Sequence, residues 1–364
     1  MPGQLGANHS RFGVRRTTGA CAFLFHQRNV GACCCSCKPG GLQRSFYPLD
    51  FAIAMVRLAF SKFILLALPI FLAACATTPP IQFKNVVEPQ AASIEPLHSD
   101  KPVIALVLGS GGNRGFAHIG VIKVLEANDI HIDIVVGTSA GSVVGALYAG
   151  GYTGNEIEQI ALGLDQEHLD DYDISKRGYI RGERLQDFID RKLNNRSIEQ
   201  LDRPFVAVST QLRTGNEVDF NRGNAGKAVR ASSSIPGVYY PVQIGEEEYV
   251  DGDLKNPVAA NVARKMGADI VIAVDISQQP KDNPPPQDVI DILKQSLRIM
   301  RQSILEHELM PAQIVIRPAI GKLPEMDGAG KLSVIKTGEE AAIAAIPQIR
   351  EWVQKIANEK RLAK

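Results

Sequence analysis

Short runs of consecutive apolar residues recur along the chain, separated by stretches in which the apolar residues are spaced as in a helix. Runs of about five residues without polar alternation are typical of strands buried on both faces of a parallel sheet. They predict strands at residues 103–108, 132–136, 205–209, 270–275 and 314–316.

Helical spacing lies between these strands. It predicts helices at residues 116–127, 143–149, 155–164, 182–193, 288–309 and 341–357, the last of which contains the only tryptophan, Trp352. Strands that alternate with helices predict a parallel sheet covered on both faces. The expected fold class is therefore α/β, a three-layer α/β/α arrangement with a mainly parallel central sheet.

The second predicted strand ends in Gly137-Thr-Ser-Ala-Gly141, a Gly-x-Ser-x-Gly match. A strand, a sharp turn and a helix in this order form a nucleophile elbow, in which the central serine has a strained backbone that only small neighbours tolerate. Ser139 would stand at the N-terminus of a helix, whose free N–H groups favour negative charge. The motif predicts that Ser139 is a nucleophile.

A glycine-rich segment, residues 109–115, follows the first predicted strand and precedes a helix. Its backbone N–H groups could cradle the phosphates of a dinucleotide, or they could form an oxyanion hole for an ester under attack. A dinucleotide site needs an acidic residue at the end of the second strand. Because Ser139 follows that strand instead, the oxyanion hole is the favoured interpretation.

A serine nucleophile needs a base, and two candidates emerge. Of the seven histidines, only His307 comes late enough for the Ser–Asp–His order of ordinary α/β-hydrolases, but it lies in a charged amphipathic stretch typical of a surface helix. Asp251 follows a short strand and precedes Gly252, so a tight turn would hold its carboxylate at a strand end. A carboxylate placed in this way can accept the serine proton directly.

Together these motifs resemble those of the patatin-like phospholipase family, particularly its bacterial members related to neuropathy target esterase. The resemblance covers about residues 101–277 and rests on Gly111-Gly-Asn-Arg-Gly115, Gly137-Thr-Ser-Ala-Gly141 and Asp251-Gly-Asp253. Asp253 departs from the family pattern, which often has Gly or Ala there.

The resemblance implies a patatin-like fold and hydrolysis of acyl esters of phospholipids or related lipids, with no cofactor and no catalytic histidine. It implies that Ser139 is the nucleophile and Asp251 the base. The implied oxyanion segment consists of Gly111, Gly112, Asn113, Arg114 and Gly115, and the motif residues around the dyad are Gly137, Gly141, Gly252 and Asp253.

The N-terminal region carries a different signal. A basic start after Met55, an apolar run from Phe63 and Leu72-Ala-Ala-Cys75 together follow the plan of a secretory signal and resemble a bacterial lipobox. In a lipobox the cysteine is lipidated and becomes the first residue of the mature chain. The alternative is an uncleaved anchor helix, although about 12 apolar residues are short for a span of about 20.

These features predict the organisation of the chain. Residues 1–54 are expected to be untranslated or disordered, 55–74 to be a lipoprotein signal peptide, and 75–100 to be a lipidated tether reaching at most about 80 Å. Residues 101–280 would be the catalytic core, which residues 281–364 complete. Because Ala76 follows Cys75, the expected location is a bacterial membrane, on the periplasmic side of the outer membrane.

Charge and cysteine usage exclude several classes of protein. Residues 1–75 carry eight Lys and Arg and one Asp, and the rest of the chain carries 32 basic and 38 acidic residues, so the remainder is near −6. A domain with this net negative charge lacks the excess of basic residues that binds nucleic acid. All six cysteines lie within residues 1–75, so neither disulfides nor a cysteine metal site are expected to hold the catalytic region together.

The favoured function is therefore a serine acyl hydrolase that uses a Ser139–Asp251 dyad. The alternatives are a Ser–Asp–His esterase that uses His307, and a catalytically silent lipid-binding scaffold. An aspartate base near its reference pKa of about 3.9 would keep activity at lower pH than a histidine base near about 6.5. The remaining polar clusters are expected to be ordinary loop or solvated surface; they are Ser232, Ser233 and Ser234, and Asp170, Asp171 and Asp173.

Overall fold

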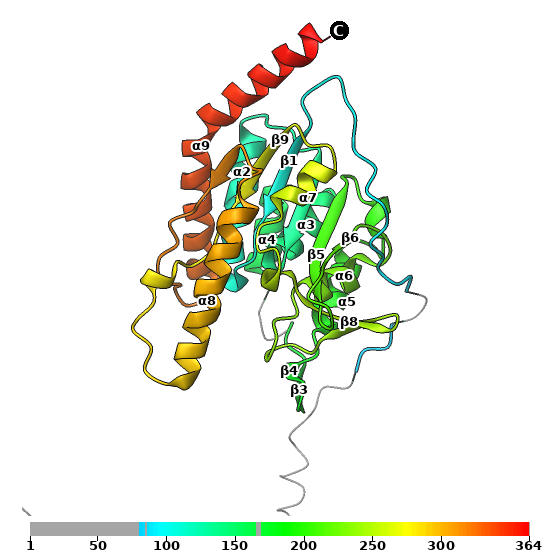
Figure 1. Cartoon of the computed structure of the whole chain (residues 1–364), viewed down its shortest axis with the longest axis vertical. Helices are drawn as coiled ribbons and strands as arrows, with labels where there is room; N and C mark the ends of the chain where they lie inside the picture. Colours follow the sequence, from blue (N-terminus) through cyan, green and yellow to red (C-terminus); the bar gives the residue numbers. More distant parts are fainter. Residues whose placement is uncertain (1–79, 84–85, 165–168, 364) are drawn as a thin grey trace, which may run out of the picture. The chain divides into compact units, whose positions relative to one another are not determined.

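The computed structural model describes residues 80–83, 86–164 and 169–363. Over this part of the chain, a central sheet has the strand order β10-β9-β1-β2-β5-β8-β7, with β6 also paired to β5. Figure 1 shows helices in front of and behind this sheet. The described part of the chain thus has the three-layer α/β/α architecture that the hydrophobic pattern predicts.

Five parallel strands form one side of the sheet: β1 (Ile104–Leu108), β2 (Ile134–Thr138), β5 (Phe205–Gln211), β9 (Ile270–Val274) and β10 (Ile314–Ile316). They confirm the five predicted strands, with ends displaced by up to two residues. Successive side chains of a strand point to opposite faces of the sheet, and each face has its own hydrophobic cluster. Leu106 packs in the cluster on one face and Val107 in the cluster on the other.

The other side of the sheet is antiparallel, which the sequence pattern did not show. The strands β6 (Glu217–Phe220) and β8 (Glu247–Asp251) pair with β5, and β7 (Val242–Ile244) pairs with β8. A separate hairpin consists of β3 (Tyr172–Ser175) and β4 (Gly178–Ile180). Most of these strands have only three or four residues, too few to show a hydrophobic pattern that identifies a strand.

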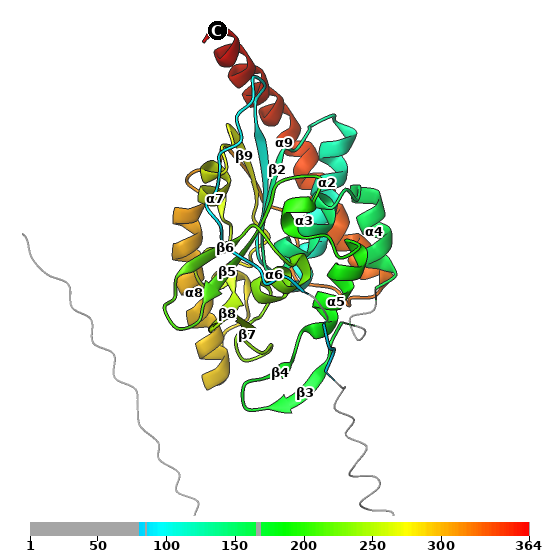
Figure 2. The ribbon, with the colours of Figure 1, turned by 90° about the vertical axis from the view of Figure 1, so that its right-hand side faces the viewer.

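The helices divide between the two faces of the sheet (Figure 2). One face is covered by α2 (Phe116–Ala127), α3 (Ala140–Ala149), α4 (Gly154–Leu162), α5 (Glu183–Lys192), α6 (Ala225–Ser232) and α9 (Gly328–Leu362). The other face is covered by α7 (Ala260–Lys265) and the end of α8 (Val289–Glu308). Within the described residues, no helix has both the length and the apolar character needed to cross a membrane.

Helix α9 is longer than the sequence pattern predicted, because it begins at Gly328 instead of residue 341. Gly338 of α9 and Gly120 of α2 allow the two helices to approach closely. A Cβ on Gly338 would collide with the Ala117 carbonyl oxygen, and one on Gly120 would collide with that of Ile335. One glycine in each helix thus lets the two helix backbones touch.

Residues 86–97 lie against the domain, contrary to the expected free tether. The Gln90 N–H donates to Arg222 O (3.0 Å), and the Leu97 N–H donates to Met266 O (2.8 Å). Asn221 exchanges two hydrogen bonds with the backbone of Ala92. The described part of this segment is therefore a strap on the surface of the domain.

Candidate active site

Ser139 stands at the junction of β2 and α3, as the elbow motif predicts. Its backbone has φ 54° and ψ −124°, a conformation that is costly for a residue with a side chain. The two flanking glycines make the turn possible: a Cβ on Gly137 would lie 2.5 Å from Gly141 O, and one on Gly141 would collide with Leu108 O. The turn thus presses the start of α3 against the ends of β1 and β2.

Asp251 ends β8, next to the carboxyl end of the parallel strands. Its Oδ2 accepts a hydrogen bond of 2.6 Å from the Ser139 hydroxyl, and both residues are buried. Its Oδ1 accepts from the Asp253 N–H (2.8 Å), and that bond fixes the carboxylate plane. Gly252 is required here because a Cβ would collide with Val208 O. The two residues implied as a dyad are therefore in direct contact.

Burial gives the Asp251 carboxyl an unusual affinity for protons. Loss of water and the neighbouring Asp253 charge raise its pKa to about 7, while the bonds from Ser139 and from the Asp253 N–H oppose that rise. The sequence alone predicted a pKa only slightly above about 3.9. The pKa lies higher than that expectation, because β5, α6 and the elbow bury Asp251 almost completely. A carboxyl that titrates near neutrality is suited to accept and return a proton.

Asp253, the departure from the family pattern, belongs to a polar bridge to α8. Its Oδ1 accepts hydrogen bonds from the Ser110 hydroxyl and from Arg301 Nε (2.5 Å). Arg301 also donates to the Ser110 hydroxyl (2.7 Å) and to Ser110 O (3.2 Å). The extra carboxylate thus links the glycine-rich loop to α8 and leaves the Ser139–Asp251 contact intact.

The glycine-rich loop passes beside Ser139 as the short helix η1 (Gly112–Gly115). A Cβ on Gly115 would lie 2.8 Å from the Ala140 Cβ, so the loop packs directly on the elbow. The buried Arg114 donates to Ile276 O (3.0 Å) and Gly321 O (3.1 Å). Arg114 thus holds the loop in place.

His118 supports the same loop from α2. It is fully buried, and burial lowers its pKa to about 4, so the ring is neutral at pH 7. Its Nε2 lies 2.8 Å from Gly109 O. Because a carbonyl can only accept, Nε2 must carry the ring proton and donate it. His118 therefore positions the start of the loop.

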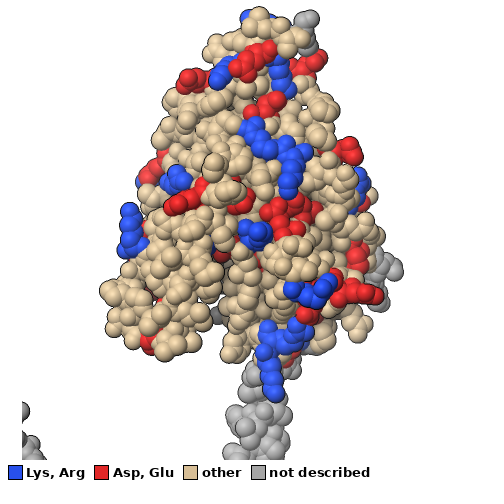
Figure 3. Space-filling view, in the orientation of Figure 1, with Lys and Arg blue, Asp and Glu red and all other residues tan. Residues whose placement is uncertain are grey.

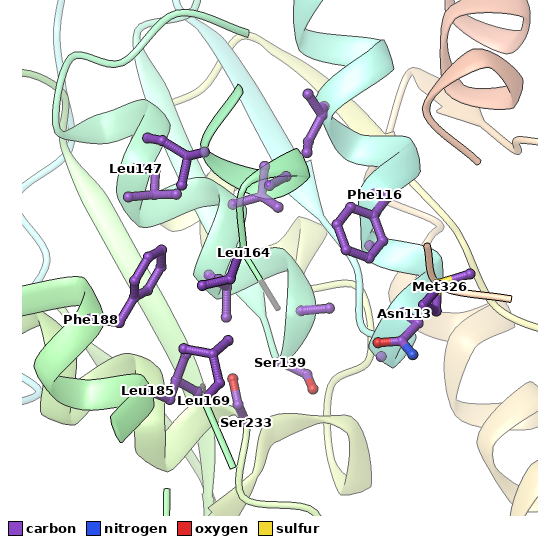
Figure 4. A pocket seen from close by; sticks show the side chains of 18 of the residues that line it. Asn113, Phe116, Ser139, Leu147, Leu164, Leu169, Leu185, Phe188, Ser233 and Met326 are labelled. Atoms are coloured by element: carbon purple, nitrogen blue, oxygen red, sulfur yellow. The ribbon is translucent and has the colours of Figure 1, made fainter. Parts of the chain in front are cut away.

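A cavity of about 220 Å³ opens beside Ser139. Figure 4 shows the Ser139 side chain at one end of it and Phe116, Leu147, Leu164, Leu185 and Phe188 around it. Gly112, Asn113 and Gly115 of the glycine-rich loop line the same cavity. The Ser139 side chain, the glycine-rich loop and a mostly apolar chamber thus meet at one point.

The sequence analysis missed two contributors, one at the end of α6 and one just after it. Ser232 is buried; its hydroxyl accepts the Ser139 N–H (2.9 Å) and donates to Val208 O (2.6 Å). Ser234 O accepts the Asp251 N–H (2.9 Å). The expectation of plain loop serines is wrong, because this segment fastens both members of the pair. The motif Ala231-Ser-Ser-Ser234 was the available signal.

Two of the three aspartates expected on a solvated surface are placed differently. Asp170 and Asp171 are buried, and Asp170 lines the cavity. Asp171 accepts from the N–H groups of Gly182 (2.6 Å) and Glu183 (2.8 Å) at the start of α5. Only Asp173 remains partly exposed, near Arg181. Asp170 thus forms part of the cavity wall, and Asp171 caps the N-terminus of α5.

The structure does not bring His307 to Ser139. His307 lies near the end of α8 with 80% of its side chain exposed, and it contacts Glu308 (3.4 Å). Among the described residues, no group of three or more His, Cys, Asp and Glu side chains could hold a metal ion. The lipidation candidate Cys75 lies outside the described residues.

Comparisons with known proteins agree with this class of fold. Residues 106–264 match the patatin-like phospholipase family model. An uncharacterized NTE family protein of Mycobacterium tuberculosis is 38% identical over 192 residues, which cover 52% of this chain and 53% of that protein. Patatin-like phospholipase domain-containing protein 6 of Mus musculus is 34% identical over 184 residues, covering 48% of this chain and 14% of that protein.

The crystal structure of VipD from Legionella pneumophila aligns with a TM-score of 0.48 and 13% identity, covering 76% of this chain and 72% of that one. The chain spans about half the length of the mycobacterial relative. Residues 106–264 are thus similar to patatin-like phospholipases, and the relatives of this region include NTE family proteins.

Proposed function

We propose that this protein hydrolyses acyl esters of phospholipids or related lipids through Ser139 and Asp251. The observation that carries the proposal is the 2.6 Å hydrogen bond from the Ser139 hydroxyl to a buried carboxylate, at the mouth of an apolar cavity. A serine bonded to a base within such reach is the arrangement of an activated nucleophile.

The reaction needs one base that acts twice. Asp251 accepts the Ser139 proton as Oγ attacks the acyl carbonyl carbon, and it returns that proton to the departing alcohol. It then takes a proton from water, whose oxygen attacks the acyl-serine and releases the fatty acid as Ser139 regains its proton. Backbone N–H groups of residues 111–115 are suited to stabilise the oxyanion, each such donor contributing roughly 3 kcal/mol in serine hydrolases.

The cavity supports a lipid as the substrate. Its lining is dominated by aliphatic and aromatic side chains. Each buried methylene gains about 0.8 kcal/mol, so an acyl chain placed there contributes binding free energy in proportion to its length. The few polar groups at the reacting end are those of Ser139, Asn113 and Ser233.

Substitution of the proposed dyad tests this function. Ser139→Ala and Asp251→Asn should each lower kcat by roughly a thousandfold or more on a short-chain ester, as loss of a nucleophile or base does in serine hydrolases. A fluorophosphonate should label the parent chain and not Ser139→Ala. Circular dichroism and the melting temperature would verify that both variants fold.

His307→Ala is the control that separates the mechanisms. It should retain the parent rate, because its imidazole points into solvent. Loss of activity in that variant would support a histidine base. Absence of both labelling and hydrolysis in the folded parent chain would favour the lipid-binding scaffold.

We also propose that the protein is a membrane-attached bacterial lipoprotein acylated at Cys75, on the periplasmic side of the outer membrane. Support comes from Leu72-Ala-Ala-Cys75 after an apolar run. Such an anchor would bring the domain to its lipid substrate.

A further inference from the structure

Helix α8 has its apolar and polar faces reversed relative to a normal surface helix. A surface helix buries its apolar stripe and exposes its polar side. In the first three turns of α8 the apolar residues occupy roughly half of the helix circumference, at 3.6 residues per turn. All of them are exposed: Val289, Ile290, Ile292, Leu293, Leu297, Ile299 and Met300, with exposed fractions between 50% and 78%.

The polar side of the helix faces the protein instead. Gln295 donates to Pro280 O (2.9 Å), and Arg301 is bonded to Asp253 and Ser110 at the active site. Only near its end does α8 bury apolar side chains, at Leu305, followed by Leu309 directly after the helix. Hydrogen bonds of its polar side and the packing of its last turn therefore hold α8 against the domain. The apolar side of its first three turns is exposed and packs against no other described residues.

This face is a contiguous apolar surface of the kind that marks an interaction site. Figure 3 shows few charged side chains over the α8 lobe at the lower left, whereas charges of both signs are mixed over the rest of that view. Lys294 lies at the edge of the apolar arc and is exposed. The opposite edge carries the exposed Asp288, so the stripe is apolar between single charges of either sign and complements the boundary between acyl chains and headgroups.

Other exposed apolar groups lie at the same end of the domain. Figures 1 and 2 both place the first half of α8, the β3–β4 hairpin and the first described residues at this end. The hairpin exposes Tyr172 and Tyr179, a residue type favoured at membrane interfaces. Ile235, which lines the cavity, is also exposed. The active site thus opens among groups that suit a lipid surface.

We propose that the apolar face of α8 docks in the plane of a phospholipid bilayer and holds the Ser139 site at the lipid surface. This inference rests on the proposed function, because a bilayer contains the proposed substrate. Amphipathic helices of this kind bury their apolar face about 5–10 Å into the headgroup boundary without spanning the membrane. Arg301 then connects the docked helix directly to the Asp253 end of the active site.

Local fluorescence in the full chain tests docking independently of any lipid anchor. In a Trp352→Phe background, Leu297→Trp places the only tryptophan on the apolar face of α8. Ile343→Trp is the matched control, because Ile343 is an equally exposed apolar residue on α9. Each protein is mixed with phosphatidylcholine–phosphatidylglycerol vesicles whose acyl chains carry bromine, a contact quencher.

Docking predicts a blue shift and loss of emission for the α8 probe and no change for the α9 probe. No quenching at position 297, or equal quenching at both positions, would overturn the proposal. A blue-shifted α8 probe without vesicles, together with a dimer by gel filtration, would show that a second copy covers the face and would overturn it as well.

Activity separates this inference from the proposed function. Leu293→Ser combined with Leu297→Ser should lower the rate on vesicle lipid several-fold relative to a soluble short-chain ester, and Ile343→Ser combined with Leu362→Ser should leave that ratio unchanged. An unchanged ratio in the α8 variant would overturn docking while hydrolysis stands. Quenching at position 297 in a folded chain that hydrolyses neither substrate would uphold docking and refute the proposed function.

Discussion

At the scale of single residues, the site keeps two groups in unfavourable states. Ser139 has a positive φ that costs of order 1–3 kcal/mol, and Asp251 is a carboxyl buried away from water. Both are held by backbone contacts from elsewhere in the sequence: Ser232 bonds the Ser139 N–H, and Ser234 bonds the Asp251 N–H. A strained backbone at Ser139 beside a buried carboxyl, both held by the surrounding fold, is typical of a pre-organised reaction site.

The raised pKa of Asp251 predicts the acid side of the pH profile. The ionised carboxylate is the active form, so kcat/KM on a soluble ester should be lost as pH falls through about 7. Asp253→Asn removes the charge that raises this pKa, so the acid limb should move to lower pH. Rates measured from pH 4 to 9 in both proteins would check this.

The matched control is Asp129→Asn, in an exposed turn after α2, which should leave the limb where it is. Because Asp253 also bonds Ser110 and Arg301, its substitution can lower the maximal rate as well. The position of the limb, not its height, is therefore the readout. A limb near pH 4 in the parent chain would show that the carboxyl is not desolvated as described.

At the scale of elements, the sequence predicts best where the pattern is local. Five parallel strands are continuous apolar runs, and the motifs at their ends place Ser139 and the glycine-rich loop. The strands β6 and β7 and the hairpin β3–β4 were not predicted, because a three- or four-residue strand is defined by its partner. Asp251 was predicted as the base only with help from the other motifs, and its hydrogen bond to Ser234 depends on a contact between distant parts of the sequence.

The packing of α2 on α9 gives a prediction for stability. Alanine favours a helix over glycine by about 1 kcal/mol, so Gly338→Ala would stabilise an isolated helix. Here the added methyl meets the backbone of Ala117, which cannot move aside like a side chain. Overpacking typically costs about 1–3 kcal/mol, so the variant should unfold at a lower urea concentration.

Gly328→Ala, at the first residue of α9, is the control within the same helix. No atom lies within 4 Å of the Cβ that it would add, so its midpoint should stay the same or rise. A stabilised Gly338→Ala variant would mean that the two helices do not approach as closely as described.

At the scale of the whole molecule, the strap changes how an anchored domain would meet its substrate. The Ile81 N–H donates to Glu183 (2.7 Å), so the chain is fastened to α5 six positions after Cys75. At about 3.3 Å per residue, six residues reach roughly 20 Å, compared with about 80 Å for the tether expected from sequence. A lipid on Cys75 would thus hold this end of the domain close to a membrane, where the proposed docking face of α8 could engage it.

The final prediction concerns that anchor. In a bacterial host, the chain should be cut before Cys75 and acylated there, because Leu72-Ala-Ala-Cys75 follows a basic start and an apolar run. Mass spectrometry of the mature N-terminus should find a lipid-modified Cys75 as residue one. Cys75→Ala should block both cleavage and acylation, and Cys37→Ala is the control that should leave both unchanged. An uncut chain that begins at Met1 and carries an unmodified Cys75 would refute the lipoprotein proposal and the expected start at Met55, and α8 would then have to bring the domain to lipid by itself.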